Sequence, residues 1–231
     1  MKKLLAIALC AGMFTTAKSQ VYLQGGVNFA NVSTSNSGAT QKNNMLTTFN
    51  AGIMARSNAS EPIALEAGLL LEGRGAKADT YLTSSTTDNY VKTKFNPLYL
   101  ELPVNFVIRL PLQGKSNIFF NAGPYVAMGI AGKSKVESMF LGSASSSTYD
   151  IKFNNDNPST TQQEDASYDK LKRFDYGVNI GGGFDLGKII LKANYSLGMA
   201  KINSTQSNNS ANDKNKYRTV SVSVGIPLHG K

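Results

Sequence analysis

The side chains of this chain that could do chemistry are carboxylates and cations, because the other reactive types are almost absent. The single histidine is His229, and the single cysteine, Cys10, lies in a segment that we expect to be removed. Nucleophilic hydrolases and zinc sites depend on His or Cys side chains. We therefore predict no catalytic residue, no metal site and no cofactor, and we interpret His229 as a solvated residue near the end of the chain.

A second group of candidates consists of acids and bases within predicted strands, on the side that faces away from the apolar residues. If the third and fourth strands pair through a turn near residue 84, Glu66 and Glu101 lie close together. Buried carboxylates need a neighbouring Lys or Arg. We predict a polar cluster in the lumen, which either fills it with ion pairs or forms a narrow path for ions or protons. Its members are Glu66, Glu72, Glu101, Arg56, Arg109 and Lys192.

Basic residues also gather at the strand ends that adjoin the long connections. Lys and Arg are suitable partners for phosphate groups. One interpretation is a basic rim that faces lipopolysaccharide, and the other is a set of ordinary solvated strand ends. Nucleic acid is disfavoured as a partner, because the chain is expected to be exported and has no stacking motif. The rim residues are Lys133, Lys135, Lys172, Arg173, Lys216 and Arg218.

The elements that position these side chains are predicted to be strands, because apolar residues recur with a period of two. Most of the segments are longer than a typical strand and match the 9–11 residues that cross a bilayer at a tilt. No charged residue falls on their apolar faces. The eight segments are residues 21–31, 47–56, 63–74, 95–109, 117–131, 174–185, 188–199 and 218–228.

The opposite faces of these strands are polar and rich in glycine. A barrel of about eight strands has an interior just wide enough for side chains, so small residues there would leave room for Tyr99, Tyr125 and the charged groups. We predict that the apolar faces turn outward into lipid. A soluble, lipocalin-like barrel is the alternative, and it would require the same apolar faces to point inward.

The connections alternate between long and short. Residues 32–46, 75–94, 132–173 and 200–217 are long, whereas 57–62, 110–116 and 186–187 are short. Outer-membrane barrels have short periplasmic turns and long extracellular loops. The long connections are rich in Ser, Thr and Asn, as in residues 143–147 and 206–212, and we predict that they are mobile surface loops.

The N-terminus has the order of a secretory signal peptide. Lys2 and Lys3 precede an apolar run that is too short to span a membrane, and small residues at Ala17 and Ser19 suit a cut before Gln20. We predict a signal peptide over 1–19 and one barrel domain over 20–231. Export removes three lysines and Cys10 and leaves 21 basic and 15 acidic residues.

Four short blocks resemble the PorT-like outer-membrane β-barrel family of Bacteroidetes. They are residues 99–105 (YLELPVN), 123–126 (GPYV), 173–177 (RFDYG) and 195–198 (YSLG). The resemblance spans nearly the whole mature chain and implies an outer-membrane barrel. The founding member of the family is linked to type IX secretion and gliding, so the resemblance also implies an accessory role in secretion. The terminus Leu228-His229-Gly230-Lys231 departs from the aromatic ending of many bacterial barrels.

The sequence thus predicts an all-β protein, an eight-stranded antiparallel transmembrane up-and-down barrel with an N-terminal signal peptide, located in the outer membrane. We expect a monomer without an open diffusion pore, with a structural, surface-interaction or secretion-accessory role. Outer-membrane lipid and lipopolysaccharide are the expected partners, together with proteins that contact the extracellular loops. A barrel enzyme is disfavoured, because the chain has one histidine.

Overall fold

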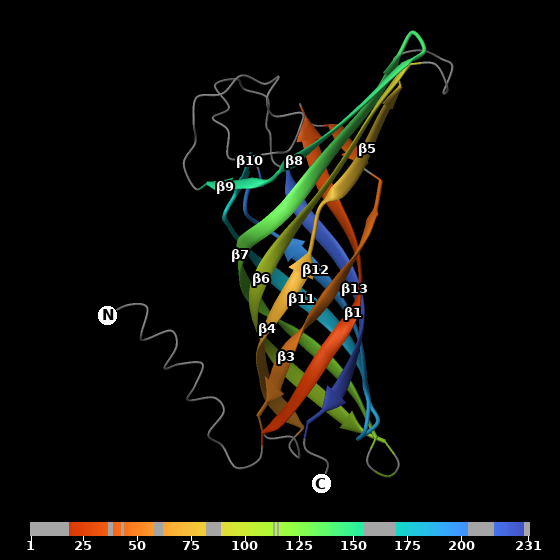
Figure 1. The fold of residues 1–231 in the computed structure, drawn as a ribbon. Coiled ribbons are helices and arrows are strands. Elements are labelled where there is room, and N and C mark those ends of the chain that lie inside the picture. Colours follow the sequence, from red (N-terminus) through yellow and green to blue (C-terminus); the bar gives the residue numbers. More distant parts are fainter. Residues whose placement is uncertain are drawn as a thin grey trace.

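Figure 1 shows the fold of the chain in a computed structural model, in which every described element is a β-strand. The structure describes residues 19–36, 39–42, 44–57, 62–81, 89–112, 114, 116–154, 170–202 and 215–228. Over these ranges, no helix is long and apolar enough to cross a membrane. The predicted signal peptide up to residue 18, His229 and residues 206–212 lie outside the described residues.

Eight strands form a closed antiparallel barrel. Each pairs with its neighbour along the chain, and the last pairs with the first, which closes the ring. The predicted eight-stranded up-and-down barrel is confirmed. The strands are β1 (Gln20–Asn36), β3 (Leu46–Arg56), β4 (Ile63–Gly73), β6 (Tyr90–Pro111), β7 (Asn117–Phe140), β11 (Phe174–Asp185), β12 (Ile190–Gly198) and β13 (Lys216–Pro227).

The apolar faces of the strands point outward. Along β6 the side chains of Phe106 and Ile108 are 63% and 55% exposed, whereas Glu101 and Asn105 are each 1% exposed. Successive side chains of a strand point to opposite sides of the sheet, so this alternation separates an apolar exterior from a polar lumen. The lipocalin-like alternative is wrong, because it places these apolar residues inside the barrel.

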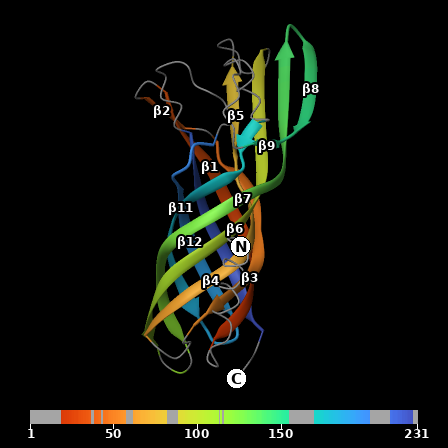
Figure 2. The ribbon, with the colours of Figure 1, turned by 90° about the vertical axis from the view of Figure 1, so that its left-hand side faces the viewer.

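Five shorter strands lie at the upper end of the barrel in Figure 1. Two of them, β5 (Ala76–Tyr81) and β8 (Ser143–Asp150), pair with the upper parts of β6 and β7. With those upper parts, residues 90–97 and 132–140, they form what we call the surface sheet, which rises above the barrel in Figure 2. The others are β2 (Ala39–Lys42), which pairs with β1, and the parallel pair β9 (Lys152–Asn154) and β10 (Lys170–Lys172).

The prediction of mobile loops over residues 75–94 and 132–173 is therefore wrong for much of their length. Residues 143–147, for example, lie within β8. The sequence pattern missed these strands because both faces of the surface sheet carry polar residues outside the membrane. Without an apolar face, the alternation that identifies a half-buried strand disappears.

A β-bulge changes which side chains of β7 face outward. Leu98 pairs with Ala131 and Tyr99 pairs with Gly129, so Ile130 is an extra residue in β7. Below the bulge the even-numbered residues of β7 are exposed, and above it Lys133 and Lys135 are exposed. A bulge inserts one residue and reverses the alternation beyond it. Without the bulge, the alternation of the lower strand would direct both lysines inward.

The hairpin between β7 and β8 ends in an apolar tip. Leu141 and Gly142 form its two-residue turn, with φ angles of 48° and 79°. Positive φ at both central residues is the type I′ geometry that suits the twist of a hairpin. Leu141 is 81% exposed beside the exposed Phe140. An apolar residue thus occupies a left-handed position where Asn or Gly would be less strained.

A charge on the outer face should destabilise the barrel. Val222 lies midway along β13, opposite Val27 and Ala193, and is exposed. We expect Val222→Arg to lower the free energy of unfolding by about 2–4 kcal/mol, the cost of arginine at the bilayer midplane. Denaturant unfolding of protein folded into lipid vesicles measures the change. The control Val222→Leu should stay within about 0.5 kcal/mol of the wild type. Equal stability of the two variants would contradict a lipid-facing Val222.

Candidate functional site

The lower half of the lumen is filled by a network of ion pairs around Glu66, which we call the lower cluster. Its carboxylate accepts hydrogen bonds from Arg56, at 2.7 Å and 3.0 Å, from Tyr22 at 2.8 Å, and from Lys192. Arg56 also pairs with Asp185 at 3.4 Å. These residues come from β1, β3, β4, β11 and β12. Two cations therefore meet two carboxylates, which satisfies the requirement that buried charges be paired.

A second network, the upper cluster, surrounds Arg74 just beyond the end of β4. Its guanidinium pairs with Glu101 and Asp175, and lies 3.5 Å from Glu72. The Tyr125 hydroxyl donates a 2.9 Å hydrogen bond to Asp175. Arg74 is 1% exposed. One buried cation thus serves three carboxylates, and its planar fork of donors suits this task better than a lysine ammonium would.

Aromatic rings enclose the Arg74 guanidinium. The ring centroids of Tyr125, Tyr99 and Tyr217 lie 4.7 Å, 5.4 Å and 5.9 Å from its central carbon. A cation over an aromatic face is stabilised by the ring quadrupole. Room for Tyr125 depends on Gly177, since a Cβ there would lie 2.8 Å from the tyrosine hydroxyl oxygen. Glycine on the inward face therefore makes space for the large side chains.

Amide and hydroxyl groups occupy the lumen between the two clusters. Asn50 donates to Asn28 at 2.6 Å and accepts from Ser223 at 2.9 Å. A cavity beside these groups, lined in part by Glu72 and Lys192, has a volume of about 10 Å³. That volume holds about one water molecule. Side chains therefore occupy most of the middle of the lumen.

Apolar side chains cover the upper cluster at the mouth of the barrel. Ile151, Leu171 and Ile202 are buried in one group with Tyr99 and Tyr217. Phe153 of β9 packs edge-on against Tyr99, with ring centroids 5.6 Å apart. Phe153 also rests against Gly129, where a Cβ would collide with its ring. The short sheet of β9 and β10 thus forms a mouth cap over the buried charges.

The structure divides the predicted lumen residues between the two clusters. Arg56, Glu66 and Lys192 belong to the lower cluster, and Glu72 and Glu101 belong to the upper cluster. The sixth, Arg109, is buried near the lower end, where its backbone N–H donates to Pro62. Within the described residues, no group of three His, Cys, Asp or Glu side chains is placed to hold a metal ion.

The predicted proximity of Glu66 and Glu101 is wrong. Glu66 lies opposite Asn105, and Glu101 lies opposite Leu70. The same register continues upward through β5, where Tyr81 pairs with Tyr90. The observed register is therefore displaced from the one expected of a turn near residue 84. This displacement moves Glu101 four residues along β6 from the expected position, into the upper cluster.

The alternation of the strands also directs Tyr22 and Arg74 inward, and both are buried in the lumen. Sequence reasoning did not include Asp175 and Asp185 in the lumen site. Asp175 and Asp185 share the inward alternation of β11 and are 3% and 4% exposed. That alternation was the signal that could have identified them.

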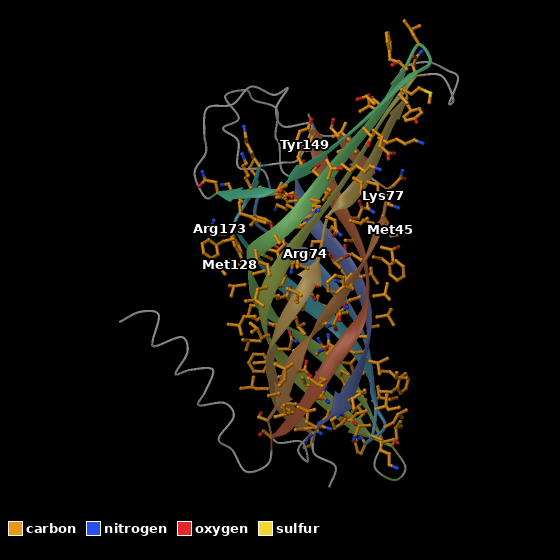
Figure 3. The ribbon with its side chains drawn as sticks, viewed as in Figure 1. Met45, Arg74, Lys77, Met128, Tyr149 and Arg173 are labelled. Atoms are coloured by element: carbon orange, nitrogen blue, oxygen red, sulfur yellow. The ribbon has the colours of Figure 1, made fainter. Side chains whose placement is uncertain are left out.

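The basic rim residues lie at the upper ends of the barrel strands, above the apolar exterior. Lys133, Lys135 and Arg173 are exposed, and Lys172, Lys216 and Arg218 are half-buried. Figure 3 shows Arg173 next to Met128 on one side of the barrel, and Lys77 next to Met45 on the other. The Arg218 guanidinium also donates to the carbonyl of Gly198 at 2.7 Å. Cations thus follow directly after the apolar surface on opposite sides of the barrel.

The four blocks that resemble PorT-like barrels meet around Arg74. They supply Tyr99 and Glu101 from β6, Tyr125 from β7, and Asp175 from β11. The block from β12 supplies Gly198, where a Cβ would lie 3.3 Å from the Tyr125 hydroxyl oxygen. These blocks are far apart in the sequence, and the upper cluster is the place where they come together.

A closed eight-stranded barrel with an apolar exterior and a filled polar lumen is the architecture of a small outer-membrane β-barrel protein. The sequence profile of the outer membrane protein β-barrel domain family matches residues 14–204. The chain belongs to this family and is an outer-membrane protein. No curated protein sequence matches the chain.

Solved structures that are similar to this chain include those of two bacterial proteins. Ail, the attachment invasion locus protein of Yersinia pestis, is 14% identical, with a TM-score of 0.40; the alignment covers 91% of this chain and 99% of Ail. Neisserial surface protein A is also 14% identical, with a TM-score of 0.38, and the alignment covers 90% of this chain and 97% of that protein.

Removing the cation of the upper cluster should destabilise the barrel strongly. Arg74→Met leaves Glu72, Glu101 and Asp175 around an apolar side chain. We expect a loss of about 3–5 kcal/mol in unfolding free energy, as for one partner removed from a buried ion pair. Denaturant unfolding, followed by the heat-dependent gel mobility of folded barrels, measures it.

Two further variants separate charge from packing at the same position. Adding Glu72→Gln, Glu101→Gln and Asp175→Asn to Arg74→Met removes all three uncompensated charges, so most of the lost stability should return. As a surface control, Lys135→Met acts on an ion pair whose side chains are 48% and 42% exposed, and should change stability little. If Arg74→Met were as mild as this control, the upper cluster would not stabilise the fold.

Proposed function

We propose that the protein is a non-conducting outer-membrane barrel that holds the surface sheet at the cell exterior. The filled lumen is the observation that carries this proposal. Two ion-pair clusters, the amide groups between them and the mouth cap occupy its length. An eight-stranded barrel has no spare width in which a channel could bypass them. The surface beyond the membrane is therefore where the protein acts.

The orientation in the membrane follows from the two ends of the barrel. Short connections join strands at the lower end, and the surface sheet lies at the upper end in Figure 1. Outer-membrane barrels place short turns in the periplasm and long connections outside. We assign the upper end to the cell exterior. A signal peptide over 1–19, cleaved near Ser19, accounts for export.

The basic rim supports a contact with the anionic outer leaflet. Lys133 and Arg173 are exposed above the outward-facing Met128 and Phe174. Lys and Arg pair favourably with phosphate groups. The rim therefore anchors a monomeric barrel in lipopolysaccharide, while the apolar tip at Phe140 and Leu141 provides a contact for protein partners. The protein is not an enzyme in this proposal.

The alternative function is an accessory role in secretion in a member of the Bacteroidetes, which the PorT-like resemblance implies. Its four blocks supply buried residues around Arg74, which is a structural task within the barrel. They therefore support the fold more directly than they support secretion. A deletion strain tested for protein secretion distinguishes the roles, because a surface anchor is dispensable for secretion.

The first experiment tests the closed lumen. Purified protein inserted into planar lipid bilayers should give no steady ion current, whereas a diffusion porin measured under the same conditions should conduct. Phe153→Ala, which opens the mouth cap, should also give no current, because both clusters remain below it. A steady current through the wild-type protein would reject the proposal. If Phe153→Ala conducts and the wild type does not, the mouth cap rather than the two clusters blocks the passage of ions.

The second experiment tests the anchor. Lys133→Gln, Arg173→Gln and Lys216→Gln together remove three cations of the rim. We expect weaker binding of intact lipopolysaccharide to the detergent-solubilised protein, and a smaller dependence on salt, since screening acts on exposed charges. Titration at two salt concentrations measures both. Unchanged affinity and salt dependence would leave these residues as ordinary solvated strand ends.

A further inference from the structure

The outer face of the surface sheet carries a row of three lysines. The backbone register places Lys77 of β5 opposite Lys94 of β6, and Lys94 opposite Lys135 of β7. Directly opposed residues of neighbouring strands point to the same side, with Cβ atoms about 5 Å apart. We call these residues the lysine row. It spans about 10 Å across three strands.

This row is electrostatically unfavourable by itself, because like charges that face each other across strands destabilise a sheet. The next row upward has the opposite character. There the register aligns Lys92 with Glu137, so that a cation faces an acid. The next row thus combines opposite charges, whereas the lysine row concentrates positive charge. A ligand of opposite charge would neutralise the positive charge of the lysine row.

The lysine row lies in a groove of about 320 Å³. Lys77, Lys92, Lys94 and Lys135 line it, together with Thr93 and Glu137. Two backbone hydrogen bonds to Asn44, of 2.8 Å and 3.0 Å, fix Lys77 at the edge of the sheet. Glu137 pairs with Lys135, whose hydrogen bond and charge hold the pKa of that carboxyl below its ordinary value. One acid therefore offsets part of the positive charge in the groove.

The height of the groove above the membrane indicates which phosphates it can meet. On the outer face, Leu98 and Ala131 form the last apolar pair below the lysine row, followed by Asn96 with Lys133 and then Lys94 with Lys135. Four residues of strand rise about 13 Å, which is about 10 Å along the membrane normal at the usual barrel tilt. The headgroup layer of a phospholipid is only about 5–7 Å thick. The lysine row therefore lies above phospholipid phosphates, at the level of phosphorylated sugars.

We propose that the groove around Lys77, Lys94 and Lys135 binds a phosphate group on the saccharide part of lipopolysaccharide. This inference rests on the proposed function, since it requires the upper end to face the cell exterior. The other rim residues contact the leaflet around the barrel, whereas this groove, which includes the rim residue Lys135, holds one phosphorylated saccharide on one side of it. Its position directly above lipid-facing Leu98 allows the same glycolipid to place its acyl chains on the apolar exterior.

The test uses deacylated, phosphorylated lipopolysaccharide oligosaccharide and the full-length, detergent-solubilised protein in titration calorimetry. Removing the acyl chains isolates the groove from contacts with the apolar exterior. We expect Lys77→Gln/Lys94→Gln/Lys135→Gln to weaken binding at least about tenfold, because charge-assisted contacts to phosphate are lost. Glu137→Gln should bind more tightly than the wild type, because Lys135 is released from its ion pair. The wild type should not bind the same oligosaccharide after enzymatic removal of its phosphates.

A control with the same change in charge is Lys152→Gln/Lys170→Gln/Lys188→Gln. Lys152 and Lys170 lie on β9 and β10, and Lys188 lies in the lower turn between β11 and β12. This control should bind like the wild type, and heat-dependent gel mobility verifies that every variant is folded. The inference is overturned if the groove variant retains full affinity, if the control loses as much, or if the dephosphorylated oligosaccharide binds equally well.

The results also separate this inference from the proposed function. The rim variant of Lys133, Arg173 and Lys216 could weaken binding of intact lipopolysaccharide while the groove variant changes no binding. In that case the anchor is supported and the groove inference fails. If the wild type binds neither intact lipopolysaccharide nor the oligosaccharide, both fail. If the groove variant alone loses the oligosaccharide, the groove inference is supported even where the rim is dispensable.

Discussion

Every charge that enters the lumen of this barrel must find an opposite charge there, because lipid surrounds the wall and the interior has almost no water. Glu66 meets Arg56 and Lys192 in the lower half, and Arg74 meets its carboxylates in the upper half. A buried charge without a partner is far more costly than a paired one. Because these pairs join strands that are distant in sequence, they hold the barrel together as one unit.

In the proposed function, the interacting parts of the molecule lie at its upper surface. There β6 and β7 continue beyond the membrane and are joined by β5 and β8. The bulge at Ile130 keeps Lys133 and Lys135 on the same outer face as the lipid-facing residues below them. One continuous face therefore passes from hydrocarbon contact to cationic groups. This is the order in which a glycolipid presents its acyl chains and its phosphates.

The upper cluster connects the family resemblance to the physics of the fold. The blocks that resemble PorT-like barrels supply the carboxylates and rings around Arg74, and glycines that leave space for them. Short motifs of this kind are explained by packing around one guanidinium. The mouth cap covers the cluster, so these motifs do not face the exterior.

The eight barrel strands, their direction and their two faces could be predicted from the sequence pattern alone. Residues 174–185 were predicted with the bounds that β11 has, because a strand between lipid and a narrow lumen must alternate apolar and polar side chains. Which charges meet could be seen in the folded barrel alone. The register of β4 and β6 separated Glu66 from Glu101, and the bulge set the outward direction of Lys133 and Lys135. The alternation along one strand indicates which face of the sheet a residue lies on. Register and bulges depend on how two strands pair, and the local sequence pattern of one strand does not encode that pairing.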